Sequence, residues 1–213
     1  MVRVTWEQYS KKPEWGFMGS VIGVLFAILS TYQVITQAGV PSSALILYRL
    51  LFLGWFIFQG IGFFAVSRRY RDVLSFVAFE FGLLSALSLA AAYARATMAF
   101  GGAWLLNLLF CFAEAMYLIM GGGSVISVGR RTNQAAPFTL AGIVFIIAGA
   151  LIGLGRFLPE LGTFFFVAWY MYESGLLLVI VVNILACLVF YNLMAEGAVE
   201  GMVAASDSGA GIQ

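Results

Sequence analysis

The sequence predicts an all-α protein, a polytopic bundle of six transmembrane helices. Of its 213 residues, 62% are hydrophobic and only 10% are charged, whereas a soluble domain carries about a quarter charged residues. The mean hydropathy is +0.99. A membrane helix needs roughly 20 apolar residues to cross about 30 Å of hydrocarbon. Six runs meet that requirement, at residues 15–36, 43–66, 73–94, 101–121, 138–157 and 164–191.

The breaks between these runs carry turn-forming residues. AGVPSS precedes the second run, SRRYRD the third, AFGG the fourth and PELG the sixth. The longest break is GGGSVISVGRRTNQAAP at 121–137, and its glycines are predicted to give a flexible exit from the fourth helix. We therefore expect an interfacial N-terminal segment at 1–14, a six-helix transmembrane domain at 15–194 and a soluble tail at 195–213.

The basic residues predict the orientation. With six helices, eight of them fall on the side of the two termini and three on the other side. By the positive-inside rule, both termini are expected on the cytoplasmic or matrix-like side. The first side carries Arg3, Lys11, Lys12, Arg68, Arg69, Arg71, Arg130 and Arg131, and the second carries Arg49, Arg95 and Arg156.

These features predict a multi-pass integral membrane protein of a plasma membrane or an organellar inner membrane. Among the basic residues, Arg68, Arg69, Arg130 and Arg131 are expected to meet lipid head groups. The lipid bilayer is thus the first predicted partner.

Small residues predict where helices pack closely. Gly19 and Gly23 form a G-x-x-x-G pair in the first run, and Gly149 and Gly153 form another in the fifth. Such pairs let helix backbones approach in lipid, where the hydrophobic effect does not drive association. Packing within the bundle is the preferred interpretation, and a contact with a second copy or another subunit is the alternative.

Composition argues against several functional classes. The sequence contains no histidine, and histidine is a common haem ligand, zinc ligand and general base. Its only lysines are Lys11 and Lys12, so no lysine is available within a span for a retinal Schiff base. A net charge of +1 gives no concentrated basic face for nucleic acid. We expect no enzymatic activity, no cofactor, no metal and no nucleic-acid partner.

Three glutamates, Glu80, Glu114 and Glu173, fall within the apolar runs. Carboxylates in membrane spans are costly, so they usually face the bundle interior and mark function. At 1.5 Å per residue, Glu80 and Glu114 are expected about 10 Å from the cytoplasmic face, and Glu173 about 14 Å from the outer face. Glu80 is predicted to share its helix face with Ser88.

Polar neighbours are predicted for two of these glutamates. Asn107 lies two turns before Glu114, on the same helix face. For Glu173, Arg49 is at a suitable depth to form an ion pair, and Arg156 is the competing partner. The three carboxylates are interpreted as structural pairs or protonated acids, as parts of a proton or ion path, or as contacts to another subunit or lipid. The structural interpretation is preferred.

Two stretches, FEFGLLSAL and YMYESGLLLV, share Glu-x-Gly-Leu-Leu. A shift of 93 residues superposes Glu80 on Glu173, and Gly60 and Gly62 on Gly153 and Gly155. Each half would hold three helices, so the second would be inverted, as in many transporters. The first and fourth runs match poorly at this shift, so the 3+3 inverted repeat is a hypothesis.

Two functions remain. The preferred one is a non-catalytic subunit of a larger membrane complex, either energy-transducing or translocating. It is favoured by 20 Phe, 9 Tyr and 5 Trp, by glycine-rich faces and by short loops, and it predicts other membrane subunits or self-association as partners. The alternative is a small channel or a proton-coupled transporter that uses the intramembrane glutamates.

Overall fold

A computed structural model describes residues 13–36, 42–96, 103–132, 134–160 and 165–209. These residues form six helices and no strand, which confirms the all-α prediction. The helices are α2 (Glu14–Thr36), α3 (Ser42–Tyr70), α4 (Val73–Ala96), α5 (Ala103–Gly129), α6 (Ala135–Glu160) and α7 (Phe165–Gly209).

Five of these helices, all except α4, are long and apolar enough to cross a membrane. In α4 the apolar part within the described residues, Val73–Ser88, is shorter. The lengths and compositions of five helices are therefore those of a multi-pass membrane protein, and the sixth predicted span, α4, stays a prediction.

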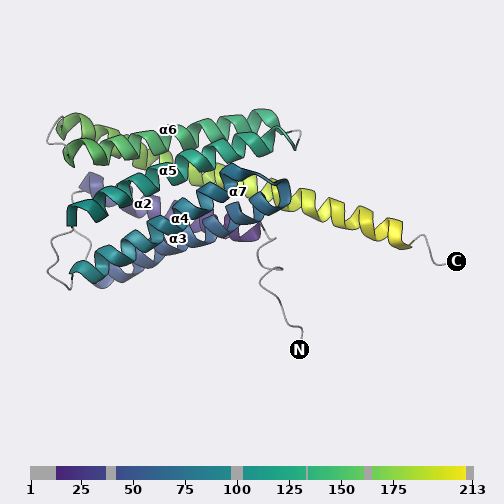
Figure 1. The fold of residues 1–213 in the computed structure, drawn as a ribbon, viewed down its shortest axis with the longest axis horizontal. Coiled ribbons are helices and arrows are strands. Elements are labelled where there is room, and N and C mark those ends of the chain that lie inside the picture. The colour runs from purple at the N-terminus through teal and green to yellow at the C-terminus, as the bar shows by residue number, and fades with distance from the viewer. Residues whose placement is uncertain (1–12, 37–41, 97–102, 133, 161–164, 210–213) are drawn as a thin grey trace.

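The helices run up and down the bundle (Figure 1). Each helix packs on the next in sequence, and α7 returns to α2, which closes the order of neighbours into a ring. The start of α2 and the far end of α7 lie at the end where α3 meets α4 and α5 meets α6 (Figure 1). We call this end the Asp72 end, and the opposite end, where α6 finishes, the Arg156 end.

The prediction of a flexible exit from the fourth helix is wrong. Helix α5 continues through the glycine triplet 121–123 and ends at Gly129. A Cβ on Gly122 would lie 2.5 Å from the carbonyl oxygen of Gly142 on α6, so these glycines permit close helix packing. Glycine is tolerated in a membrane helix because lipid offers the backbone no other hydrogen-bond partner.

The last helix is the longest element. Helix α7 has 45 residues, which corresponds to about 68 Å at 1.5 Å per residue. Its span-length apolar part is Phe166–Glu196, and the remainder extends beyond the other helices (Figure 1). The first part of the segment 195–213 is thus a helical continuation of α7, and its predicted solubility stays a prediction.

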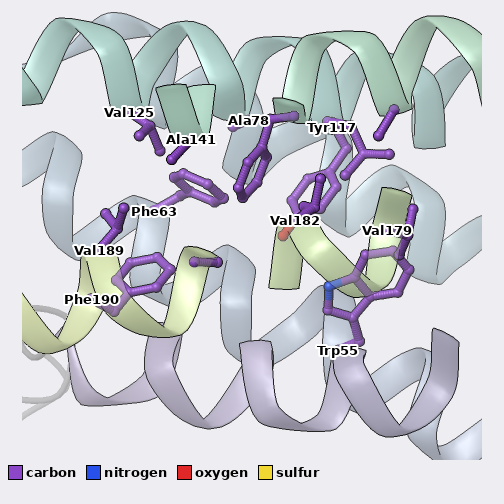
Figure 2. Close-up of a cluster of buried hydrophobic side chains, with 14 of the residues drawn as sticks. Trp55, Phe63, Ala78, Tyr117, Val125, Ala141, Val179, Val182, Val189 and Phe190 are labelled. Atoms are coloured by element: carbon purple, nitrogen blue, oxygen red, sulfur yellow. The ribbon is translucent and has the colours of Figure 1, made fainter. Parts of the chain in front are cut away.

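Aromatic side chains fill the centre of the ring. Trp55 and Phe56 on α3 and Tyr117 on α5 have no exposed surface. The ring centroids of Phe63 and Tyr117 are 5.9 Å apart, and those of Phe63 and Phe190 are 5.6 Å apart, both edge to face. Figure 2 shows Trp55, Phe63 and Tyr117 projecting into the space between the helices.

The predicted packing glycines lie at helix crossings within the chain. A Cβ on Gly19 would lie 2.1 Å from a backbone nitrogen of α3, and one on Gly23 would lie 2.3 Å from a side-chain oxygen of α7. A Cβ on Gly149 or Gly153 would come within 2.8 Å of Ala115 on α5. Without side chains at these positions, α2 approaches α3 and α7, and α5 approaches α6.

Candidate functional site

Glu114 on α5 and Arg156 on α6 form an ion pair inside the bundle. Arg156 Nη1 lies 2.7 Å from Glu114 Oε2. Glu114 is 1% exposed, while the Arg156 side chain keeps 23% of its surface exposed. The contact lacks the alignment of a hydrogen bond at Glu114 Oε2. Because desolvation offsets much of the attraction in a buried pair, its clearest effect is to fix the two helices relative to each other.

Arg156 also contacts α7 and an aromatic ring of α5. Its Nη2 donates a hydrogen bond of 2.9 Å to the Tyr172 hydroxyl. The guanidinium lies 4.9 Å from the ring centroid of Tyr172 and 5.1 Å from that of Phe110. One cation therefore connects α5, α6 and α7 through a carboxylate, a hydroxyl and two aromatic faces.

Arg156 was predicted as the competing partner of Glu173, but the structure pairs it with Glu114. Because α5 continues to Gly129, Glu114 lies 15 residues, or about 22 Å, from that end rather than about 10 Å. Because side chains on a helix tilt toward its start, the long Arg156 side chain can reach back along α6 to the level of Glu114, which it contacts. Glu173 lies half-buried on α7 toward the Arg156 end, and Arg49 lies half-buried on α3.

The face of α5 predicted to carry both Asn107 and Glu114 is described only in part. Cys111, between Asn107 and Glu114, is buried. Asn107 is in α5, but its side chain lies outside the described residues. Its place beside Glu114 stays a prediction.

Glu80 differs from the expectation that it faces the bundle interior. It is exposed on α4, on the same side as Val73 and Phe76, which are 72% and 44% exposed. Ser88, which was expected on the same face, is buried, because a separation of eight residues turns the helix about 80° away. Glu80 forms no hydrogen bond or ion pair with the described part of the chain.

A buried polar network around Gln59 was not predicted. The Gln59 Oε1 accepts hydrogen bonds from Trp55 Nε1 at 2.8 Å and from the Tyr117 hydroxyl. Its Nε2 donates to Ser20 Oγ at 2.7 Å and to Asn183 Oδ1 at 3.2 Å. These five residues join α2, α3, α5 and α7, and none has exposed surface. The available signal was two carboxamides, each in the middle of an apolar run.

Asp72 organises a second network that was not predicted. Its Oδ2 accepts hydrogen bonds of 2.8 Å from the Ser75 backbone N–H and hydroxyl, which caps the start of α4. Its Oδ1 accepts one of 2.8 Å from the Ser127 hydroxyl on α5. The Ser75 hydroxyl also contacts that of Ser124 on α5. The Asp-x-x-Ser spacing before an apolar run is the signal that could have predicted this cap.

Glu196 ties α7 to the Asp72 end. Its two carboxylate oxygens accept hydrogen bonds of 3.1 Å from the Tyr70 hydroxyl and from Gln134 Nε2. One turn earlier, the carbonyl oxygen of Leu193 accepts a hydrogen bond of 3.0 Å from Arg69 Nη1. Helix α7 is therefore held by α3 and by the α5–α6 connection where it leaves the bundle.

The four arginines predicted to meet lipid head groups all lie at the Asp72 end. Arg68 stacks over the Phe64 ring at 5.5 Å, and Arg131 donates a hydrogen bond to the Tyr70 carbonyl oxygen. Arg68, Arg130 and Arg131 are exposed, while Arg69 is half-buried. Their contact with lipid phosphates stays a prediction.

An open apolar groove of about 680 Å³ runs between α5 and α6 on the outside of the bundle. Small residues, Ala115, Gly149 and Gly153, lie in its lining beside the larger Phe112 and Phe157. Its lining is apolar and holds no charged side chain. The groove therefore offers shape for hydrocarbon but no group that would select a polar ligand.

No family model, no curated protein and no solved structure matches this chain. Within the described ranges, no group of three or more His, Cys, Asp or Glu side chains is placed to hold a metal ion. The functional argument therefore depends on the geometry of the intramembrane polar groups.

Proposed function

We propose that this protein is a non-catalytic helical subunit of a larger membrane complex, either energy-transducing or translocating. The observation that carries the proposal is Glu80, a carboxylate on the outward face of an apolar helix. A carboxylate facing hydrocarbon has a high free energy, and such groups in membranes normally pair with donors. Glu80 has no partner in the described part of its own chain. A donor from another molecule would lower the free energy of this carboxylate most directly.

Two further features support a subunit. The ring centre is filled by buried side chains such as Trp55, Tyr117 and Gln59, which is what a structural bundle needs. Helix α7 extends beyond the other helices (Figure 1), and a projecting helix offers a surface outside the membrane for a further contact. In this proposal the protein lies in a plasma or organellar inner membrane, with both termini on the cytoplasmic or matrix-like side.

The experiment is gentle solubilisation of the native membrane, followed by native mass measurement of the particle that contains this chain. We expect the chain to travel with other polypeptides at fixed stoichiometry. A homogeneous monomer or small homo-oligomer, obtained in both a mild detergent and lipid nanodiscs, would overturn the proposal.

The ion pair of Glu114 and Arg156 favours a second candidate, a small channel or proton-coupled transporter. A buried charge pair that connects three helices is the kind of element that can exchange partners during a transport cycle. The test is pH-dependent flux in proteoliposomes with the wild-type protein and with Glu114→Gln, Glu80→Gln and Glu173→Gln. This candidate requires at least one variant to change the flux, and unchanged flux in all three would remove it.

A further inference from the structure

We infer that the outward face of α4 around Glu80 is the docking site for one transmembrane helix of a partner protein, and that this helix carries an arginine or lysine opposite Glu80. The inference rests on the proposed function above. It adds the position of the contact and the chemistry of the partner.

The spacing of outward-facing residues on α4, four of them exposed and Leu83 half-buried, suits a helix as the occupant. Val73, Phe76, Glu80, Leu83 and Leu87 follow one another at alternating steps of three and four residues. This is the spacing of the seam between two helices that wrap around each other. We call these five residues the α4 stripe. Val73 and Leu87, at its two ends, are 72% and 66% exposed. A second helix would therefore find a continuous ridge of side chains along about 20 Å of α4.

The single polar residue of the α4 stripe, Glu80, indicates the charge of the side chain that the partner helix places opposite it. Glu80 lies at the centre of the α4 stripe and has no partner in the described part of the chain. Arg68, at the end of α3, stacks over Phe64 rather than reaching Glu80. One polar group in an apolar helix seam sets register and partner choice, and a cation is its complementary group. The partner side chain is therefore a basic one at the depth of Glu80.

Depth favours a protein donor over a lipid amine. Glu80 comes nine residues after Arg71, which places it about 13 Å along the helix axis from that basic end. A lipid amine stays near the level of the arginines, whereas a residue on a membrane helix can lie at any depth. A second copy of this chain is also disfavoured, because a symmetric contact through this face would place Glu80 opposite Glu80.

The experiment combines photo-crosslinking with charge exchange in the full-length protein, in its native membrane. A photoreactive residue replaces Leu87 on α4 or, as a control with a similar exposed fraction, Leu140 on α6, which is 62% exposed. We expect the Leu87 position, but not the Leu140 position, to crosslink a membrane segment that contains a basic residue.

The charge exchange then tests Glu80 itself. Glu80→Lys should lower the recovery of the complex about tenfold or more, as for breaking a charge pair at an interface. Replacing the partner's basic residue with glutamate should restore recovery in the Glu80→Lys background. Because Glu80 is exposed, Glu80→Lys and the uncharged control Glu80→Leu are both expected to insert and fold, which circular dichroism checks.

Several outcomes would overturn the inference. The first is full recovery of the complex with both Glu80→Lys and Glu80→Leu. The second is crosslinking from residue 87 to lipid alone, and the third is crosslinking to a second copy. A complex that stays intact and crosslinks only through other helices would remove the α4 site while leaving the proposed function in place. A monomer in native membranes would remove both.

Discussion

Gly19→Ala is expected to separate α2 from α3 and to destabilise the bundle. A Cβ at residue 19 would lie 2.1 Å from the backbone nitrogen of Gln59 and 2.6 Å from its Cα, whereas ordinary contacts begin at 3.4 Å. Backbone atoms cannot rotate away as the end of a side chain can, so the two helices must part by about 1 Å. The 2.7 Å hydrogen bond from Gln59 Nε2 to Ser20 Oγ lies next to this contact and would lengthen with it.

The magnitude follows from three contributions. Inserting a carbon into a well-packed contact costs about 1–3 kcal/mol. Losing one interhelical hydrogen bond in a membrane protein costs about 0.6 kcal/mol. Replacing glycine with alanine inside a helix returns about 0.5–1 kcal/mol. The net expectation is a loss of about 2 kcal/mol in the free energy of unfolding.

The assay is unfolding of the purified protein in mixed micelles by increasing SDS, followed by circular dichroism. Gly54→Ala is the matched control, because a Cβ there would first meet Ile22 at 3.5 Å, an ordinary contact. The control should be neutral or gain about 0.5 kcal/mol from helix propensity. Equal changes in the two variants would refute the reasoning, since both make the same substitution and differ only in the space available.

Further variants at three sites test the buried polar groups by the same unfolding measurement. Gln59→Leu leaves buried donors and acceptors on three neighbouring helices without partners, so we expect a loss of about 2–3 kcal/mol; a change below about 0.5 kcal/mol would contradict this. Glu114→Leu should cost about 2 kcal/mol, less than a fully buried pair because Arg156 stays partly exposed, and adding Arg156→Met should recover most of it; an additive double variant would argue against coupling. Asp72→Ala removes the cap of α4 and should cost about 1–2 kcal/mol, while Asp72→Asn should cost less because an Asn side chain can also cap a helix; equal losses would contradict this and show that the carboxylate itself is needed.

The helices could be predicted from hydropathy because the backbone has few conformations that satisfy its hydrogen bonds in lipid. A chain segment in hydrocarbon must satisfy its own hydrogen bonds, so an apolar run of sufficient length becomes a helix whatever its neighbours are. The glycine triplet 121–123 was misjudged because glycine is a turn signal in water but a packing residue in a membrane helix. The errors in the predicted length of α5 and in the predicted depth of Glu114 both followed from that single misjudgement.

Side-chain pairing could not be predicted in the same way. The depth of Arg156 was compatible with several acids, and the choice of Glu114 depends on how α6 is rotated against α5. The rotation is set by close contacts such as that between Gly149 and Ala115, which a sequence does not reveal. Glu80 illustrates the same limit, because intramembrane carboxylates usually face inward and only the helix rotation shows that this one does not.

The continuous form of α7 has a mechanical consequence. A helix without a break behaves as a stiff rod, and from Tyr172 to Glu196 this rod measures about 36 Å. Glu196 is held by Tyr70 and Gln134, so it marks where the anchored part of this rod ends and the projecting part begins. Between Tyr172 and Glu196, Asn183 of the same helix accepts a hydrogen bond from Gln59, so the rod is anchored along its length inside the bundle. The hydrogen bond between Arg156 and Tyr172 anchors the other end, so a force on the projecting part would be borne by the whole bundle rather than by one contact.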